Sequence, residues 1–329
     1  LRYVVRAQKS QFDDVTVVGA MPSRSDVIAY VDHLEPTEEF DGLTGYVLLD
    51  SGLPPFTCEV IEPLPYGLTA RVDGRKLLIE GVSTDNGLWE SVVRVTASNG
   101  VWVDVPVQVQ IQVRRDPHWD KVVSLLHFDG VDSSTTFLDD KGRVWTPEEG
   151  AQIDTDYFQF RGSSALFNAG GHIHTAATTD FAFGTGDYTV EVWVRVGAPP
   201  GGSVSNDRHV FGSFDFNPDM AFFLDRNANN PSVWDGSAAL TSSIGVPTNQ
   251  WTHVAWSRAA GTLRIFVGGV QGYSGTHSVN FASTAMARVG AMNSTDRKFN
   301  GWMDELRITK GIARYTENFT PPDKPFPSR

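Results

Sequence analysis

The stretch VWVDVPVQVQIQV at residues 101–113 indicates the fold class more clearly than any other part of the chain. Every odd-numbered position in it is valine or isoleucine, whereas the even-numbered positions are mostly polar. Because side chains on a β-strand alternate between two faces, this pattern predicts a strand with one buried and one solvated face. Pro106 cannot donate a hydrogen bond to a neighbouring strand, so we expect it at a sheet edge or a bulge.

The residues before this strand predict further strands that together form a β-sandwich. Residues 92–97 are also rich in valine, and Asn99 and Gly100 tolerate the positive φ of a tight turn, which predicts a hairpin. From residue 42 to residue 113, apolar runs and turns recur at a spacing of roughly ten residues, as in an immunoglobulin-like (Ig-like) sandwich. The segments SGLPPFTCEV and LPYGLTARVDGRKLLIEG resemble Ig-like modules of bacteria and phages, in which Gly-Leu-Pro-Pro and Leu-Pro-x-Gly-Leu turns recur.

The residues RRDP at 114–117 interrupt the strand pattern and are the best candidate for a domain boundary, because a residue before proline is held in extended geometry. We therefore divide the chain into three parts. Residues 1–41 are predicted to form an N-terminal arm or partial β-module, residues 42–116 an Ig-like β-sandwich, and residues 117–329 a second β-domain.

The second domain contains short apolar strands and no amphipathic helix of ten or more residues, which predicts two packed antiparallel sheets. Its segments LLHFDG, FLDDKG, GSSALF, FGTGDYTVEVWVR, WTHVAWSR and DELRITKGIARYTENFTPP, in this order, resemble the laminin-G-like branch of the concanavalin A-like lectin/glucanase jelly rolls. The closing GIARYTENFTPP is a form met especially often in virion proteins of tailed bacteriophages. Where relatives often read Tyr-Val-Asp-Gly, this chain reads FVGG at 266–269, so any role of that aspartate is absent. The predicted fold class is all-β, with an Ig-like sandwich followed by a concanavalin A-like jelly roll.

The composition argues against several classes of partner. Lys and Arg number 27 against 39 Asp and Glu, for a net charge of −12, which repels nucleic acid and anionic lipid. The single cysteine, Cys58, cannot form an internal disulfide or a multi-cysteine zinc site. The longest apolar runs, such as residues 220–224, are far shorter than the ~18 residues of a membrane helix. We expect no nucleic-acid partner and no membrane insertion.

Three aspartates are candidate ligands for a structural calcium ion: Asp129, Asp139 and Asp304. Calcium prefers hard oxygen ligands such as carboxylates and backbone carbonyls. In the fold that the chain resembles, the first and last strands lie side by side, so the resemblance implies that these carboxylates converge on calcium. The alternative is that Asp129 and Asp139 are turn residues and that Asp304 pairs with an arginine.

Aromatic residues in polar, turn-rich stretches are candidates for stacking on sugar rings. Trp234 and Tyr273 lie in such stretches, and we expect them in loops, where binding residues concentrate. Asn227 and Asn229 are expected to recognise hydroxyl groups beside them, although asparagines in loops commonly serve turns alone. Four tryptophans match the family's core strands and are expected to pack inside: Trp193, Trp251, Trp256 and Trp302.

The sequence carries no recognisable catalytic pattern. Glucanases of this superfamily use a Glu-x-Asp-x-(x)-Glu run on one strand, whereas Glu191 stands alone on its strand. Asp304 and Glu305 are adjacent, so strand alternation predicts that they face opposite ways. Gly-x-Ser-x-Gly, P-loop and His-Glu-x-x-His motifs are absent from the sequence. We therefore expect a chain that is not an enzyme.

These observations predict a non-enzymatic structural component of a tailed-phage virion, located on the tail or the head surface. Its lectin-like domain is expected to bind host-surface glycans, and its partners are expected to be other virion proteins and further copies of the chain in a symmetric assembly. The alternative is a bacterial surface or secreted carbohydrate-binding adhesin, which would be extracellular. A divergent glycan hydrolase is the third hypothesis.

Overall fold

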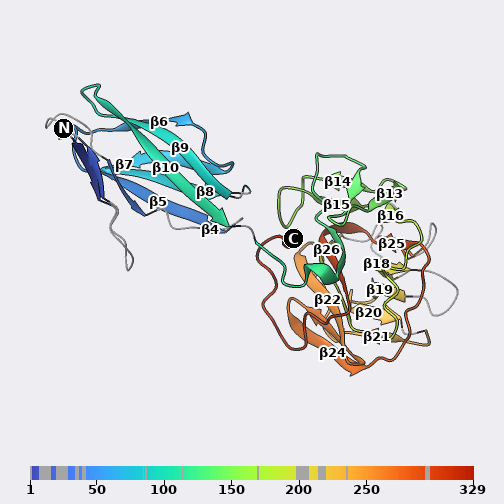
Figure 1. Cartoon of the computed structure of the whole chain (residues 1–329). Coiled ribbons are helices and arrows are strands. Elements are labelled where there is room, and N and C mark those ends of the chain that lie inside the picture. The colour runs from blue at the N-terminus through green and yellow to red at the C-terminus, as the bar shows by residue number, and fades with distance from the viewer. Residues whose placement is uncertain are drawn as a thin grey trace. The chain divides into compact units, whose positions relative to one another are not determined.

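A computed structural model shows a nearly all-β chain that divides into two compact units, Leu1–Arg115 and Asp116–Arg329 (Figure 1). The predicted all-β class is therefore confirmed. Among the described residues, the one helical element is the 3-10 turn η1 (Trp119–Lys121), and no helix there is long and apolar enough to cross a membrane. The structure describes residues 2–6, 16–19, 29–33, 37–38, 42–83, 85, 87–112, 114–168, 170–197, 207–213, 220–234, 236–292 and 297–329.

The first unit is built from two four-stranded sheets around one core. One sheet has the order β3-β5-β8-β7 and the other β4-β10-β9-β6, while β1 and β2 form a separate pair. Its strands are β1 (Arg2–Arg6), β2 (Thr16–Gly19), β3 (Ala29–His33), β4 (Thr37–Glu38), β5 (Gly42–Leu49), β6 (Thr57–Glu62), β7 (Leu68–Asp73), β8 (Lys76–Val82), β9 (Gly87–Thr96) and β10 (Trp102–Gln112).

The valine-rich strand behaves as the sequence predicts. In β10, Val105, Val107, Val109 and Ile111 are buried in the core, and most residues between them are exposed. β9 and β10 form the predicted antiparallel hairpin, and Gly100 adopts a φ of 81° in its turn. Within the described residues Pro106 pairs with β9 on one side only, because β4 pairs with β10 at Ile111 and Gln112, so Pro106 lies at the expected edge.

Part of the predicted N-terminal arm contributes to the sheets of this unit. β3 pairs with β5, and β4 pairs in parallel with β10. β3 and β4 thus supply two edge strands, whereas the sequence analysis assigned residues 1–41 to an arm or partial β-module of their own. This difference arises because strands of two to five residues carry too few apolar positions to show which sheet they join.

The second unit contains two larger antiparallel sheets. The first has the order β14-β15-β26-β17-β22-β23-β24, with β11 also pairing with β26, and the second has the order β12-β13-β16-β25-β18-β19-β20-β21. Its strands are β11 (Val122–Leu126), β12 (Phe137–Leu138), β13 (Val144–Glu148), β14 (Gln152–Asp154), β15 (Ser164–Phe167), β16 (His172–His174), β17 (Tyr188–Val196), β18 (Arg208–Ser213), β19 (Met220–Leu224), β20 (Pro231–Trp234), β21 (Ala239–Thr241), β22 (Trp251–Ala259), β23 (Thr262–Val267), β24 (Val270–Thr276), β25 (Ala287–Val289) and β26 (Gly301–Lys310).

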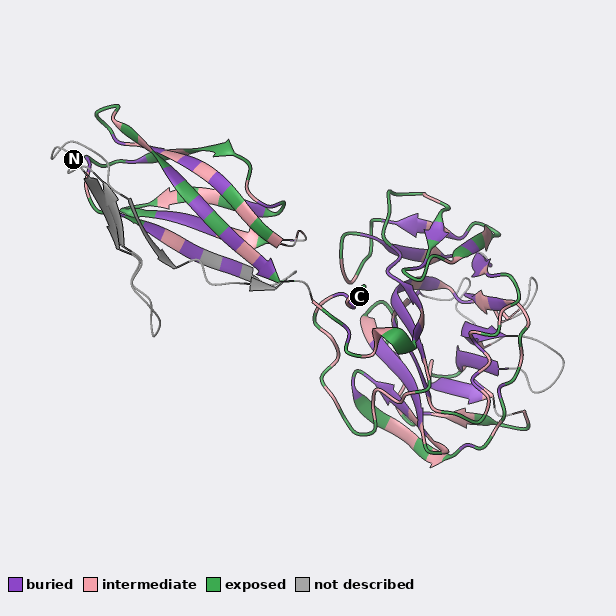
Figure 2. Ribbon diagram, in the orientation of Figure 1, coloured by how far each residue is buried: buried purple, intermediate pink, exposed green. Residues whose placement is uncertain are grey.

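The core of this unit lies between the two sheets (Figure 2). On β17, Val190, Val192 and Val194 are fully buried in it, as the alternation of the strand predicts. The first strand, β11, lies beside the last, β26, which confirms the neighbourhood that the resemblance implied.

The outer face of the β17 sheet is partly covered by the end of the chain. We call residues 311–329 the C-terminal tail. The backbone N–H of Tyr315 donates to Ser257 Oγ on β22, that of Phe319 to the carbonyl of Gly269, and that of Phe326 to Glu305 Oε2 on β26. The tail therefore crosses the sheet and returns, which encloses charged side chains that the strand pattern alone would place in solvent.

Candidate functional site

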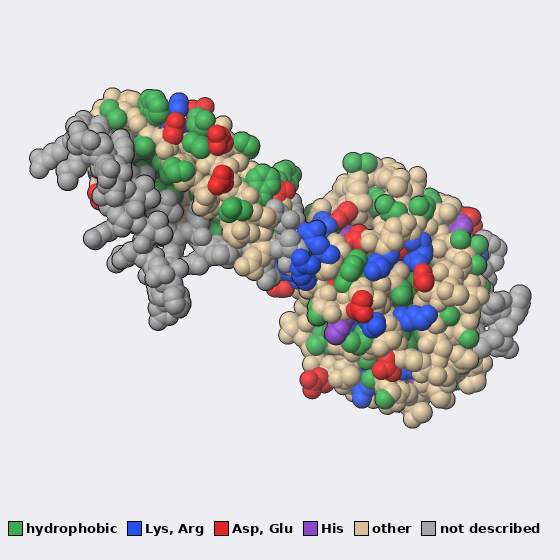
Figure 3. Space-filling view, in the orientation of Figure 1, with side chains coloured by type: hydrophobic (Ala, Val, Ile, Leu, Met, Phe, Trp, Pro, Cys, Tyr) green, Lys and Arg blue, Asp and Glu red, His purple; other side chains and the backbone are tan. Residues whose placement is uncertain are grey.

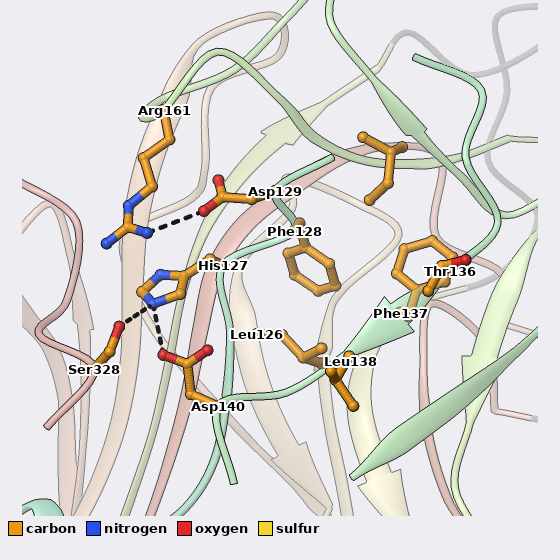
Figure 4. A pocket seen from close by; sticks show the side chains of 11 residues that line it. Leu126, His127, Phe128, Asp129, Thr136, Phe137, Leu138, Asp140, Arg161 and Ser328 are labelled. Carbon is orange, nitrogen blue, oxygen red and sulfur yellow. Dashed lines mark hydrogen bonds and ion pairs between the residues drawn. The ribbon is translucent and has the colours of Figure 1, made fainter. Parts of the chain in front are cut away.

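A small pocket opens beside β11 in the second unit (Figure 4). Its volume is about 150 Å³. Six polar and five apolar residues line it: His127, Asp129, Thr136, Asp140, Arg161 and Ser328, with Leu126, Phe128, Phe137, Leu138 and Ile153. The polar side chains come from the segment after β11, from the turn after β12, from the segment between β14 and β15 and from the C-terminal tail.

His127 is the centre of the polar side of the pocket. Its Nδ1 lies 2.6 Å from Glu305 Oε1, and its Nε2 lies 3.0 Å from both Asp140 Oδ2 and Ser328 Oγ. Burial by itself would lower the pKa of His127, but the charge of Glu305 and the hydrogen bonds to Asp140 and Glu305 outweigh it and raise the pKa to about 9. At neutral pH the imidazole is protonated and donates from both nitrogens.

The chain of contacts Ser328, His127 and Glu305 has the order of a nucleophile, base and acid. A general base must accept the proton of the serine hydroxyl, and a protonated imidazole cannot do so. The same Nε2 also forms a hydrogen bond with Asp140 Oδ2. The arrangement therefore fixes Ser328, and with it the C-terminal tail, to the sheet.

Two of the predicted calcium ligands lie next to this cluster. Asp304 Oδ2 accepts the backbone N–H groups of Gln159 and Phe160, each at 2.9 Å, whereas its buried Oδ1 has no hydrogen-bond partner. Burial raises the pKa of Asp304 well above its usual value, and the neighbouring carboxylates of Glu305 and Asp129 add to the rise. The carboxylate of Asp129 lies 3.1 Å from Arg161.

The prediction that Asp304 and Glu305 face opposite ways is wrong. Glu191 pairs with Arg307 and Trp193 with Asp304, so β26 has one more residue than β17 over this interval, and Glu305 takes a φ of 53°. Such a bulge turns two successive side chains toward one face. Both carboxylates consequently lie on the outer face of the sheet.

Asp139 does not share this site. Its Oδ1 accepts the N–H groups of Lys141 and Arg143, and its Oδ2 accepts hydrogen bonds from Ser124, Arg143 and Trp145. It thus has the turn role that the sequence left open as the alternative. Within the described ranges no three His, Cys, Asp or Glu side chains are grouped so as to hold a metal ion. Of the three predicted ligands, Asp304 alone has a buried carboxylate oxygen without a hydrogen-bond donor, whereas Asp129 is paired with Arg161.

The two asparagines predicted to bind a glycan serve the turn between β19 and β20. Asp225 Oδ1 accepts the backbone N–H groups of Asn227, Ala228 and Asn230. Asn229 has a φ of 56°, and its amide donates to the carbonyl of Val246. The Asn229 amide is thus engaged in a hydrogen bond within the protein.

The two aromatic candidates lie in strands, which corrects the prediction of loops. Trp234 is the last residue of β20, and Tyr273 lies within β24 of the other sheet, half-buried against the core. Trp234 pairs with Ala221, three residue pairs along the β19–β20 hairpin from Leu224 and Pro231 at its turn, which is about 10 Å of strand. The structure therefore does not bring Trp234 together with Asn227 and Asn229.

Only one of the four tryptophans assigned to the core is fully buried there. Trp256 has no exposed surface, whereas Trp193, Trp251 and Trp302 are half-buried on the outer face of the sheet. These three occupy the strand positions that alternate with the core residues, so the correct face could be inferred from the alternation that the sequence shows.

A buried ion-pair network lies under the tail and was not foreseen. Arg307 contacts Glu191 at 2.9 Å and Asp116 at 3.0 Å, Arg314 contacts Asp116 at 2.7 Å, and the Tyr315 hydroxyl donates to Glu191 at 2.7 Å. Burial would raise the pKa of Glu191, but the Arg307 charge and the nearby His253 and Arg314 lower it to about 2. The sequence signal for this network is a glutamate at an outward position of the valine-rich strand β17.

A family model matches a large part of the second unit. Residues 167–313 match the laminin G-like family described as the concanavalin A-like lectin/glucanases superfamily. This region is therefore a concanavalin A-like domain, which confirms the predicted jelly roll. No curated protein matches the chain.

Two solved structures illustrate the similarity. Domain 4 of AbnA, an extracellular GH43 arabinanase from Geobacillus stearothermophilus in complex with arabinotriose, is 25% identical, with a TM-score of 0.47 over 59% of this chain and 94% of that chain. The binding domain of botulinum neurotoxin serotype G is 12% identical, with a TM-score of 0.44 over 58% of this chain and 48% of that chain.

Proposed function

We propose that the chain is a non-catalytic glycan-binding protein and a structural component of a tailed-phage virion, exposed on the particle surface. The observation that carries this proposal is the match of residues 167–313 to the lectin/glucanase superfamily. The carboxylates on the outer face of the β17 sheet, moreover, are bound by other groups of the protein. Its ligand is a glycan of the host surface, and its other partners are virion proteins and further copies of the chain.

The arrangement of the carboxylates supports a binding role over hydrolysis. A glycosidase needs two carboxyl groups that reach the scissile bond from opposite sides. Glu191 has no exposed surface and is held by Arg307 and Tyr315. Glu305 is 1% exposed and is held by His127 and the N–H of Phe326. Neither group is accessible to a substrate.

The virion assignment is supported by the closing segment GIARYTENFTPP, which resembles the ends of such domains in tailed-phage proteins. In this chain the same segment is the first part of the C-terminal tail, where Arg314 and Tyr315 join the buried network. The tail therefore belongs to the domain as a folded element.

We also propose that calcium braces the second unit, with Asp129 and Asp304 as its carboxylate ligands. The positive charge of the ion would offset the charges of the two neighbouring carboxylates. The Oδ1 of Asp304, which has no hydrogen-bond partner, would coordinate the ion. Backbone carbonyl oxygens would complete its coordination.

The purified full chain tests the proposed function on a glycan array and on envelope preparations of candidate hosts, with release of reducing sugars measured in parallel. Saturable binding without sugar release supports the proposal. Release of reducing ends overturns its non-catalytic part, and the absence of binding to every glycan and envelope overturns glycan recognition. Antibody labelling decides the location: label on phage particles supports the virion role, and label on bacterial cells alone favours an adhesin.

A further inference from the structure

One row of side chains crosses five neighbouring strands on the outer face of the β17 sheet. Each member pairs directly with the next in the registers of the sheet, and all five are half-buried. At the usual strand separation the row is about 19 Å long. Its members are Gln152 on β14, Leu166 on β15, Trp302 on β26, Arg195 on β17 and Trp251 on β22.

The row lies beside the part of the face that other segments cover. Asp304, Trp193 and His253 form the next row along the same strands. The N–H groups of Gln159 and Phe160 bind Asp304, and the rings of Phe319 and Phe326 contact His253. In that covered row Asp304 and His253 are buried, whereas Trp302, Arg195 and Trp251 are all partly exposed to solvent.

Arg195 is the cation of this row and lies between Trp302 and Trp251. Its guanidinium carbon lies 4.3 Å from the centre of the Tyr157 ring and 5.6 Å from that of Trp302. Its buried Nε has no hydrogen-bond partner, and in the part of the chain that the structure describes no carboxylate forms an ion pair with it. Four other arginines of this unit form an ion pair with a carboxylate: Arg143, Arg161, Arg307 and Arg314.

The aromatic rings beside Arg195 are held in place before any ligand arrives. The indole N–H of Trp302 donates to Asp154 at 3.2 Å, and the Tyr157 ring lies 4.6 Å from the Trp302 ring. Tyr157 remains 43% exposed and its neighbour Phe158 45% exposed. Rings that are already oriented lose little conformational entropy when a flat apolar surface stacks on them.

We propose that this row binds a saccharide chain that carries carboxylates, such as a polymer of uronic acids. The inference rests on the proposed glycan-binding function and adds its location and its chemical class. The apolar faces of the sugar rings stack on Trp251 and on the Tyr157–Trp302 pair, and a sugar carboxylate forms a charge-assisted contact with Arg195. The Gln152 amide at the end of the row supplies a donor and an acceptor for hydroxyl groups.

The test measures the affinity of the full chain for polygalacturonate, alginate and hyaluronan, with methyl-esterified polygalacturonate as the uncharged match to the first. We expect tighter binding of the acidic polymer than of its ester. Arg195→Gln should weaken binding of the acid by about tenfold or more, with little effect on the ester, while Arg195→Lys restores part of the affinity. Trp251→Ala should weaken binding of both forms.

A matched pair of controls comes from the first unit, where the Arg94 guanidinium carbon lies 4.0 Å from the centre of the exposed Trp102 ring. Arg94→Gln and Trp102→Ala should leave the affinities unchanged. The proposal is overturned if none of the three acidic polymers binds, if the ester binds as tightly as the acid, or if folded Arg195 and Trp251 variants bind as the wild type does. In these cases binding to another glycan on the array would leave the proposed function standing.

Discussion

At the scale of single residues, Glu191 shows how a charge on a strand becomes part of the interior. It lies opposite Arg307 across β17 and β26, and Tyr315 from the tail covers it. With no exposed surface, it depends entirely on its partners to offset the loss of hydration. Two predictions belong to this residue.

Glu191→Gln should destabilise the second unit by about 3–5 kcal/mol, because it leaves Arg307 buried with one fewer compensating charge. Urea denaturation measures this change in the free energy of unfolding. The control is Glu80→Gln in the first unit, where the pair with Arg71 is exposed to solvent and a much smaller change is expected. Equal effects of the two substitutions would contradict the role given to the buried network.

The stability of the second unit should fall in acid because of the same residue. The pKa of Glu191 is about 2 in the folded protein against 4.5 for an ordinary glutamate, and its Arg partners lower the pKa of Asp116 as well. A lowered folded-state pKa contributes stability that is complete above the unfolded-state value and is lost as the pH falls toward the folded-state value. We expect this loss between about pH 4.5 and pH 2. Unfolding free energies across this range measure it, and a slope that Glu191→Gln leaves unchanged would refute the assignment.

At the scale of elements, the C-terminal tail and β26 act together. The bulge in β26 presents both Asp304 and Glu305 on the outer face, and Glu305 then holds the N–H of Phe326. Arg307 from the same strand lies 3.7 Å from the centre of the Phe326 ring. The strand therefore anchors the tail through a carboxylate, a cation and the apolar surface between them.

Phe326→Ala should cost about 3 kcal/mol of stability and expose the end of the tail, because a ring that is 3% exposed is lost from its contact with Arg307. Limited proteolysis followed by mass spectrometry measures the release, and thermal unfolding measures the stability. The matched variant Phe158→Ala, at a ring that is 45% exposed, should change stability by no more than about 0.5 kcal/mol. A tail that stays resistant to protease in Phe326→Ala would argue against this anchor.

At the scale of the whole molecule, the proposed calcium site and the proposed glycan-binding row are neighbours on one sheet of the second unit. The Asp129 and Asp304 region joins segments near the two ends of that unit, while the half-buried row that contains Arg195 is the next row along the same strands. On the face shown in Figure 3, acidic and basic side chains are interspersed over this unit. A cation bound by Asp129 and Asp304 would brace the domain without occupying the row that contains Arg195.

Calcium added to the chelator-treated chain should raise the melting temperature of the second unit, by an amount that corresponds to about 2.7 kcal/mol at a hundredfold excess over the Kd. Asp304→Asn should abolish the rise, because it removes a charged ligand. Differential scanning calorimetry with calcium and with EDTA measures both variants. No shift in the wild type, or the same shift in Asp304→Asn, would exclude calcium from this place.

Particular residues show how far the candidate site could be predicted from sequence. Asp129 and Asp304 were selected and do lie in one region, but the selection of Asp139 missed the pocket by one position, since Asp140 is the residue that contacts His127. Adjacent residues in a turn point to different surroundings, and composition cannot distinguish them. Likewise, Trp251 and Trp302 were assigned to the core although their alternation with core residues indicated the outer face.

What the sequence determined by itself is the all-β class and the core face of strands whose apolar residues alternate regularly. This holds because alternation along a strand is a local, two-residue property, as in β10 and β17. The tertiary structure alone decided what covers the other face. Glu191 is buried by Tyr315, which is 124 residues away, and the bulge at Glu305 arises only where β26 pairs with β17. Such outcomes depend on contacts between distant segments, and no local pattern encodes them.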